Sequence, residues 1–176
     1  MSSVYEPLPP LPDESDALDD SLARAANVML EAHMGQFRKN GAAYETHPRT
    51  VAAMFEKKSM RIIGLLHDVL EDAEEKYTAE KLRRIFPEWV VARLVILTRK
   101  PGEDYFDYIE RVNTDDACRK IKLADLWHNL SDSRPGSRRD KYRFAQHYLT
   151  TVRPPGPALS APLQIQSQPL QSALPS

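Results

Sequence analysis

Cysteine is almost absent from the 176-residue sequence, in which Cys118 is the only one. A disulfide within the chain is therefore impossible, and a zinc site built from several cysteines is excluded. The sequence also lacks an apolar run near the roughly 18 residues of a membrane span, and it lacks the basic-then-apolar order of a signal peptide at its start. We therefore expect a soluble, cytoplasmic protein with no membrane partner.

Charge of one sign is not in excess either. The chain has 24 Lys and Arg against 25 Asp and Glu, a formal net charge of -1. No strong basic field indicates nucleic-acid binding, and no basic stripe with interleaved aromatic residues is present. We expect no nucleic-acid partner, while the oligomeric state stays open.

Proline marks the two ends of the chain. Four of the 14 prolines lie in the first dozen residues, and six lie after Thr150. The C-terminal stretch carries one charge, Arg153, and is rich in Pro, Gln and Ser, a composition that cannot bury enough apolar surface to order itself. We predict a Pro-rich extension over residues 1–12, a folded domain over 13–150 and a disordered tail over 151–176.

Between these ends the apolar residues recur with helical spacing almost throughout. No alternating stretch is long enough to indicate a sheet. The sequence therefore predicts an all-α fold, a single-domain bundle of about eight helices. We expect them over residues 16–36, 48–55, 59–72, 78–86, 88–98, 105–112, 114–131 and 138–149.

The predicted helix over residues 59–72 is strongly apolar, yet His67, Asp68, Glu71 and Asp72 lie within it. Spacings of three and four residues place such groups on one flank of a helix. Carboxylates crowded on a buried flank repel one another and are costly to desolvate as ions, and a divalent metal relieves both effects. The alternative is a hydrogen-bonded core histidine next to a solvated helix end, which is the commoner situation for an isolated His-Asp pair.

Two further positions fit a metal site. Asp125 lies among apolar neighbours on a predicted helix, and Asn129 follows one turn later on the same side. A buried salt bridge with Lys122 is the alternative role for Asp125. His47 precedes Pro48 at the start of a predicted helix, where a capping or surface histidine is the alternative.

Three stretches of the chain carry a family pattern in order. Residues 35–48 read GQFRKNGAAYETHP, residues 65–72 read LLHDVLED, and residues 122–129 read KLADLWHN. They resemble the motifs GQ-x-RK-x-G-x-PY-x-x-HP, LLHDVVED and KLADRLHN of the RelA/SpoT-type HD-domain hydrolases. Within the HD metal-dependent phosphohydrolase superfamily, the chain is most similar to the stand-alone small alarmone hydrolases of the Mesh1 type.

The resemblance implies a metal centre. It assigns His47, His67, Asp68 and Asp125 as the metal ligands. Mn²⁺ is the implied metal, although mixed His and carboxylate ligands are also compatible with other divalent ions.

The resemblance also assigns residues around that centre. Glu71 and Asp72 are implied to handle the attacking water, and Arg38 to act in catalysis and in substrate binding. Lys39 and Asn129 are implied to contribute to substrate binding.

The activity implied by the resemblance is Mn-dependent hydrolysis of the 3′-pyrophosphate of guanosine 3′,5′-bis(diphosphate), ppGpp or pppGpp, to GDP or GTP and pyrophosphate. The chain departs from the family pattern at Ala43, at Leu126-Trp127 and at Ser131-Asp132. These departures leave two alternatives. One is an HD phosphohydrolase that releases phosphate from a nucleoside monophosphate or NADPH, and the other is a non-catalytic nucleotide-binding HD module.

Overall fold

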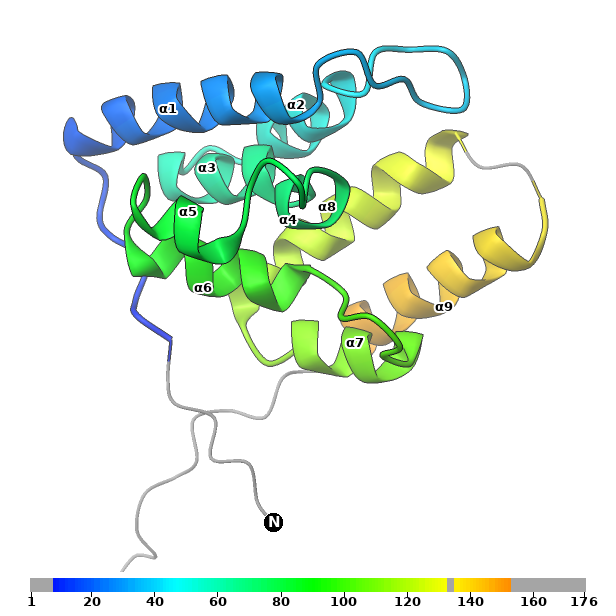
Figure 1. The fold of residues 1–176 in the computed structure, drawn as a ribbon. Helices are drawn as coiled ribbons and strands as arrows, with labels where there is room; N and C mark the ends of the chain where they lie inside the picture. Colours follow the sequence, from blue (N-terminus) through cyan, green and yellow to red (C-terminus); the bar gives the residue numbers. More distant parts are fainter. Residues whose placement is uncertain (1–7, 133–134, 153–176) are drawn as a thin grey trace, which may run out of the picture.

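The computed structural model describes residues 8–132 and 135–152, and these form an all-helical fold (Figure 1). Within the described ranges no strand occurs, and Phe37 and Ala43 form an isolated antiparallel bridge. The predicted all-α fold is confirmed. The described helices are α1 (Ala17–Ala32), α2 (Thr46–Ala53), α3 (Lys58–Leu66), α4 (Val69–Asp72), α5 (Ala79–Arg83), α6 (Glu88–Leu97), α7 (Tyr105–Val112), α8 (Asp116–Asp132) and α9 (Ser137–Thr151).

The ends of the chain lie mostly outside the described residues. Of the predicted N-terminal extension, only residues 8–12 are described, and of the predicted tail only Thr151 and Val152. The extension, the folded domain and the tail therefore stay predictions. No described helix combines the length and apolarity that a membrane crossing requires.

Helix α3 is the centre of the bundle. It packs against α1 and α2, and also against α6 and α8. Ile62, Ile63 and Leu66 are completely buried. Gly64 lets α2 approach closely, because a Cβ built at this position would lie 3.0 Å from the Ala52 Cα. The short distance between the two helices brings the start of α2 near the end of α3.

The predicted helix over residues 59–72 is interrupted, which corrects the sequence prediction of one continuous helix. Helix α3 ends at Leu66, His67 and Asp68 form a turn, and α4 begins at Val69. Adjacent residues of a regular helix point about 100° apart. At this turn the two side chains face the same point, with His67 Nε2 3.2 Å from Asp68 Oδ1.

The loop between α1 and α2 projects beside the C-terminal part of α8, at the top right of Figure 1. Its backbone folds back on itself, since Arg38 N–H donates to the Ala42 carbonyl over 2.8 Å and Gly41 N–H donates to the Arg38 carbonyl over 2.9 Å. Gly41 has φ +86°, a conformation that favours glycine. This turn fixes the backbone from which the Arg38 side chain extends.

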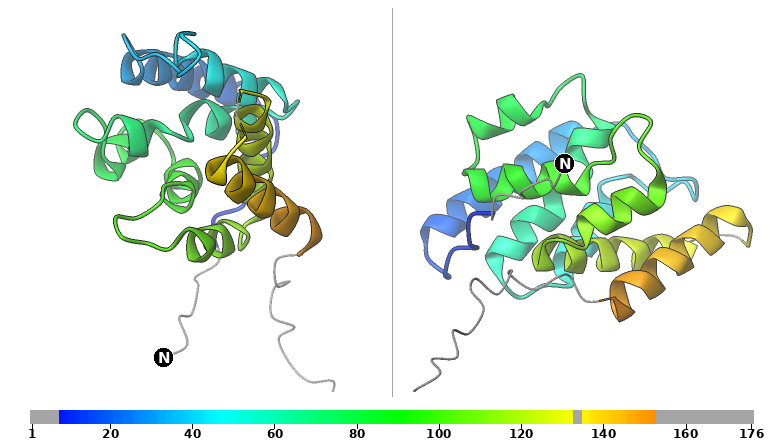
Figure 2. Two further views of the ribbon diagram at one scale, coloured as in Figure 1. Left: turned by 90° about the vertical axis from the view of Figure 1, so that its right-hand side faces the viewer. Right: turned by 90° about the horizontal axis from the view of Figure 1, so that it is seen from below.

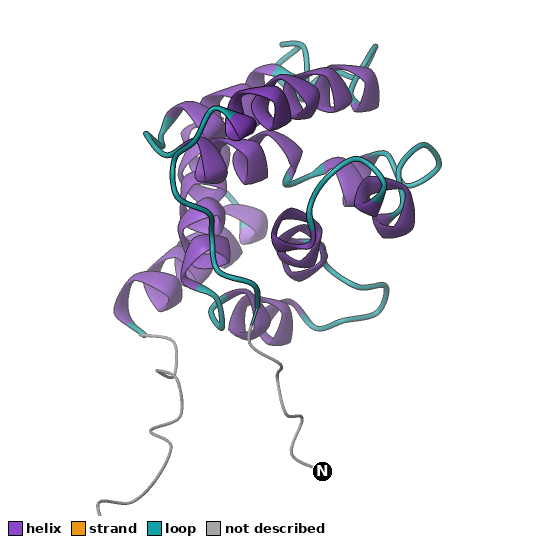
Figure 3. Ribbon diagram, turned by 90° about the vertical axis from the view of Figure 1, so that its left-hand side faces the viewer, coloured by secondary structure: helices purple, strands orange, loops and turns teal. Residues whose placement is uncertain are grey.

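The described N-terminal segment runs along the outside of the bundle (Figure 3). Its Pro9 carbonyl accepts a 2.9 Å hydrogen bond from Arg93 of α6, whose side chain is buried. The same guanidinium donates two bonds to the Asp115 carboxylate, at 3.2 and 3.1 Å. Asp115 in turn accepts from Cys118 N–H in the first turn of α8. Arg93 thus joins the N-terminal segment, α6 and the start of α8.

Helix α9 lies beside α8 and completes the bundle (Figure 2). Ala145 and Leu149 of α9 are completely buried. This packing covers one side of α8, the helix that carries Asp125.

Candidate metal centre and active site

The structure brings the four predicted metal ligands to one place from three segments of the chain. His47 lies in the first turn of α2, His67 and Asp68 in the turn after α3, and Asp125 in α8. Ligand atoms of His47, His67 and Asp68 all lie within 4.8 Å of one another. Asp125 Oδ1 lies 3.1 Å from His47 Nε2 and 3.9 Å from His67 Nε2.

The donor set fits a metal ion. His67 Nδ1 donates to the Gly64 carbonyl over 2.8 Å, which leaves the Nε2 lone pair directed toward the carboxylates. His67 Nε2 is buried and makes no hydrogen bond of acceptable geometry among the described residues, although Asp68 Oδ1 is 3.2 Å away. A buried polar atom without a partner is costly, and an ion bound by Nε2 and the two carboxylates removes that cost.

The carboxylates of Asp68 and Asp125 also require a positive charge close to them. Burial alone would lower the pKa of His67, but the charge of Asp68 and the contacts with Asp125 and Asp68 raise it to about 10. Burial would raise the pKa of Asp68, yet His67 and His47 hold that pKa well below its usual range. Two buried carboxylates therefore keep a proton on an imidazole or bind a cation in its place.

Asp125 is held by its own helix. Lys122 Nζ donates to Asp125 Oδ2 over 2.8 Å, and Asn129 Nδ2 donates to Oδ1. The salt bridge considered from the sequence as the alternative role of Asp125 is therefore present, and it coexists with the position facing the two histidines. Lys122 fixes one oxygen of the carboxylate, and the other oxygen faces the cluster.

Glu71 and Asp72 lie at the exposed edge of the cluster. Partial burial and the neighbouring charge of Asp68 raise the pKa of both carboxyl groups. A raised pKa makes a carboxylate a stronger base, which suits it to accept a proton.

Tyr44 is a site residue that the sequence prediction missed. Its hydroxyl contacts Asp68 Oδ2 at 3.0 Å and donates to Asp72 Oδ2. Burial and the charge of Asp68 raise the Tyr44 pKa, so that the hydroxyl stays protonated and can donate. The residue lies within the quoted motif of residues 35–48, but its contacts depend on how the loop folds back over α4.

Arg38 and His128 form a second group next to the metal ligands. Arg38 Nη1 lies 3.0 Å from His128 Nδ1, and His128 Nδ1 lies 2.7 Å from His47 Nδ1. The structure therefore places Arg38 near the cluster through a histidine that the prediction did not include. Lys39 is exposed, and none of these contacts involves it.

Further cations gather on the α6–α7 loop and α9. Lys141 Nζ lies 4.4 Å from the centre of the Tyr105 ring, and burial together with Arg99 and Arg138 lowers its pKa. The Arg99 backbone also hydrogen-bonds to the Glu71 carboxyl group, which places this cationic group near the acidic edge of the cluster. Arg99 and Lys141 were not predicted as site residues, since their separation along the chain hides their proximity.

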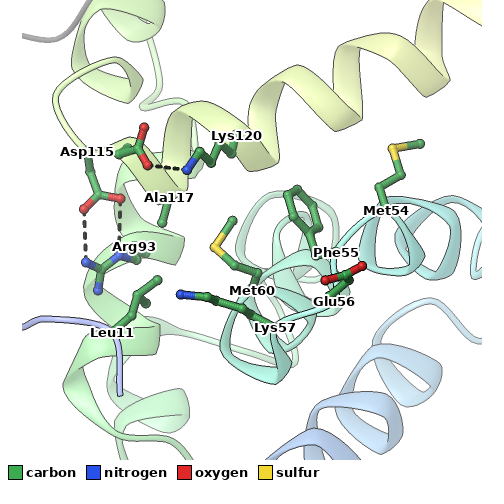
Figure 4. A pocket seen from close by; sticks show the side chains of 11 residues that line it. Leu11, Met54, Phe55, Glu56, Lys57, Met60, Arg93, Asp115, Ala117 and Lys120 are labelled. Carbon is green, nitrogen blue, oxygen red and sulfur yellow. Dashed lines mark hydrogen bonds and ion pairs between the residues drawn. The ribbon is translucent and has the colours of Figure 1, made fainter. Parts of the chain in front are cut away.

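A cavity of about 460 Å³ lies elsewhere, at the opposite ends of α2, α3 and α8 from the cluster (Figure 4). Figure 4 shows Lys57 directed into it, with the Arg93–Asp115 ion pair at one side. Its lining is Leu11, Met54, Phe55, Glu56, Lys57, Met60, Arg93, Asp115, Asp116, Ala117 and Lys120. None of the predicted site residues is among them.

Comparisons with known proteins agree with the motifs. A guanosine-3′,5′-bis(diphosphate) 3′-pyrophosphohydrolase from Haemophilus influenzae is 35% identical over 145 residues, 72% of this chain and 21% of that protein. A GTP pyrophosphokinase from Streptomyces coelicolor is 33% identical over 147 residues, 76% of this chain and 17% of that protein. No protein-family model matches the chain.

A solved structure gives the same fold. It is described as a metazoan orthologue of SpoT that hydrolyses ppGpp, and it superposes with a TM-score of 0.61 at 20% identity, over 78% of this chain and 85% of that one. The resemblance to RelA/SpoT-type HD hydrolases is confirmed. The chain spans about a fifth of the length of the curated relatives that it matches.

Proposed function

We propose that the chain is a metal-dependent hydrolase that removes the 3′-pyrophosphate of guanosine 3′,5′-bis(diphosphate), giving GDP from ppGpp or GTP from pppGpp, and pyrophosphate. The observation that carries the proposal is the buried cluster of two histidines and two aspartates, drawn from three segments, next to an arginine and an acidic pair. It stands in a fold shared with a protein described as hydrolysing ppGpp.

His47, His67, Asp68 and Asp125 would hold the metal, for which we propose Mn²⁺. When bound, a divalent ion polarises a phosphoryl oxygen and lowers the pKa of water. The unpartnered His67 Nε2 supports this assignment, as does the fixed orientation of Asp125.

Glu71 and Asp72 would manage the proton of the attacking water. A carboxylate at the exposed edge of the cluster accepts the proton as the oxygen attacks phosphorus, and its raised pKa lets it hold that proton. Tyr44 donates to Asp72 and so fixes the orientation of that carboxyl group. We propose that Glu71 and Asp72 act as a pair, one of them taking the proton.

The substrate carries two diphosphate groups, and the chain offers two groups of cations. Arg38 next to the metal ligands would bind the 3′-pyrophosphate and offset the negative charge on its oxygens while water attacks phosphorus. The bond from that phosphorus to the ribose 3′-oxygen breaks, and this oxygen leaves with a proton as the 3′-hydroxyl of GDP or GTP. Arg99, Arg138 and Lys141 lie on the Glu71 side and would face the other diphosphate. We also propose contacts of Lys39 and Asn129 with the nucleotide.

Hydrolysis is favoured over synthesis of the nucleotide, although some relatives are named for synthesis. The solved structure whose description names ppGpp hydrolysis is matched over 85% of its length. The sequence also has no Gly-rich phosphate loop of the kind that cradles a nucleotide triphosphate.

The test is a product assay. The purified chain is incubated with Mn²⁺ and, separately, with ppGpp, NADPH and several nucleoside monophosphates, and the products are separated by anion-exchange chromatography. We expect GDP and pyrophosphate from ppGpp. Orthophosphate from NADPH or a monophosphate, without cleavage of ppGpp, would instead support the alternative HD phosphohydrolase, and no turnover of any nucleotide would support a non-catalytic module.

A further inference from the structure

His128 connects two parts of the candidate site that the sequence places far apart. It projects from α8 one turn after Asp125 and is partly buried. Its Nδ1 lies 2.7 Å from His47 Nδ1 and 3.0 Å from Arg38 Nη1. The two imidazole planes differ by only 9°, and their centroids are 4.9 Å apart. Since the two nitrogens are much closer than the centroids, the rings meet edge to edge, as a hydrogen bond in the ring plane requires.

The chemistry of the neighbours decides where the hydrogens lie. The Arg38 guanidinium can only donate. His47 directs Nε2 toward Asp125 and Asp68, at 3.1 and 3.3 Å, so this is the nitrogen available to an ion. A histidine that uses the lone pair of Nε2 carries its hydrogen on Nδ1. His47 Nδ1–H therefore donates in the ring plane to the lone pair of His128 Nδ1. Arg38 Nη1 lies 3.0 Å from Nδ1 and 3.4 Å from Nε2 of the same ring, so the guanidinium lies against the face of the His128 ring.

Resting on the proposed function, we propose that His128 is a positioning residue that fixes the metal ligand His47 and the phosphate-binding Arg38 relative to each other: its Nδ1 accepts from His47, and its ring face holds the Arg38 guanidinium. Each partner needs such a contact. The His47 ring must stay oriented for Nε2 to face the two aspartates. Arg38 is a long side chain on a projecting loop, and a bond to α8 restricts where its guanidinium can go.

A matched pair of variants tests the acceptor itself. In His128→Asn the side-chain oxygen branches from the γ carbon as Nδ1 does in histidine, so an acceptor is retained. In His128→Leu a methyl group takes that place. We expect His128→Leu to weaken Mn²⁺ binding by roughly 10- to 100-fold, the usual effect of losing a partner of a metal ligand. We also expect it to raise KM for ppGpp more than it lowers kcat. His128→Asn should restore most of the Mn²⁺ affinity, because it keeps the acceptor for His47, but not the KM, because it lacks the ring that holds Arg38.

Isothermal titration of the metal-free full chain with Mn²⁺ gives the affinity without substrate, and thermal unfolding monitors the fold. His128→Leu with unchanged Mn²⁺ affinity and unchanged KM overturns the proposal. So does His128→Asn with a loss of Mn²⁺ affinity equal to that of His128→Leu at the same unfolding temperature, because the acceptor would then not matter. A wild-type chain that binds Mn²⁺ but leaves ppGpp intact contradicts the proposed function, while the titration still decides the role of His128.

A double-mutant cycle separates the two contacts. In the background of Arg38→Ala, His128→Leu has no guanidinium left to position, so we expect no further increase in KM. The Mn²⁺ affinity should still fall in this background, since the contact with His47 is independent of Arg38. Additive increases in KM would contradict the link between His128 and Arg38.

Discussion

Asp68 is the side chain on which the ligand cluster depends most directly. Its carboxylate lies 3.3 Å from His47 Nε2 and 3.2 Å from His67 Nε2, so it spans both histidines. Removal of this carboxylate leaves a single acidic ligand among the four candidates, and Asp68 contributes little to the apolar core because its side chain is 19% exposed.

We therefore expect Asp68→Ala to lose Mn²⁺ binding and turnover while the far-ultraviolet circular dichroism stays helical. Titration with Mn²⁺ and a ppGpp cleavage assay measure the two losses. Asp107→Ala, at an exposed aspartate of α7, is the control and should behave as wild type. Full activity of Asp68→Ala would remove the proposed ligand set.

Substitution of Glu71 or Asp72 should affect the turnover rate rather than the affinity for the metal. We expect Glu71→Gln to lower kcat by roughly 100-fold or more, the usual contribution of a positioned base, because an amide cannot accept the proton of the attacking water. Asp72→Asn should show a comparable loss. Both should bind Mn²⁺ with nearly wild-type affinity in the same titration. Wild-type kcat in both variants would exclude a role for the pair.

Metal binding should depend on pH. The pKa of His67 in the metal-free cluster is raised to about 10 by the adjacent carboxylates, so this imidazole is protonated at neutral pH. An ion must displace the proton, and its apparent affinity therefore rises with pH, by up to about tenfold per pH unit for each proton released, until the pH exceeds the pKa. Titrations in two buffers of different ionisation enthalpy count the released protons. An affinity that is constant between pH 6 and 8 would contradict this coupling.

The sequence was sufficient to select the four ligand candidates and the acidic pair, because their types and order match a family pattern. It did not reveal the contacts of Tyr44 and His128, although both lie within the quoted motifs. Their contacts form because the loop between α1 and α2 packs against the cluster and against α8. The spacing of residues along the sequence does not show which loop and helix come together. Arg99 and Lys141 of the cationic group were missed for the same reason.

Among the helices, α3 and α4 show most clearly where local pattern and tertiary structure differ. Several helix starts follow Pro, Gly or a capping residue and were predicted closely, as with Asp104, whose carboxylate accepts from Phe106 N–H at the start of α7. The break after Leu66 has no such signal, since neither Gly nor Pro occurs in residues 65–72. The break coincides with the two adjacent polar side chains that face the ligand cluster.

The contact between α2 and α3 predicts the effect of a single added methyl group. Gly64→Ala places a Cβ 3.0 Å from the Ala52 Cα, which is backbone and cannot rotate away. Overpacking costs about 1–3 kcal/mol, which exceeds the gain of about 0.5–1 kcal/mol from replacing glycine within a helix. We expect a net loss of stability in urea unfolding and weaker Mn²⁺ binding, as α2 carries His47.

The matched control is Ala53→Gly at an exposed position of α2, which measures the helix preference without any packing change. A Gly64→Ala variant that is more stable than wild type would show that α2 moves away without cost.

Over the whole molecule, the bundle is tied together by contacts at its two ends. The Pro9 carbonyl accepts from buried Arg93, and the Val152 carbonyl accepts a 3.2 Å bond from the buried amide of Asn113. Helix α9 ends at Thr151, so this last contact lies just beyond it.

Two truncations distinguish the described end of the chain from the tail. Removal of residues 153–176 should leave kcat and stability unchanged, since no candidate site residue lies there. Removal of everything after Thr150 also deletes Val152 and leaves the Asn113 amide buried without its acceptor, at a cost of about 1–3 kcal/mol. Urea unfolding and the ppGpp assay compare the two proteins, and equal stability would contradict the role of Val152.

The position of the ligands on three separate segments has a kinetic consequence. Stretches of about 20 and about 60 residues must close before His47, Asp68 and Asp125 can meet, so the complete chelating set belongs to the closed bundle and not to early, local structure. An ion held by such a set stabilises a late arrangement of the chain. The bound ion therefore slows unfolding and so prolongs the lifetime of the native state, while the rate of refolding stays nearly unchanged.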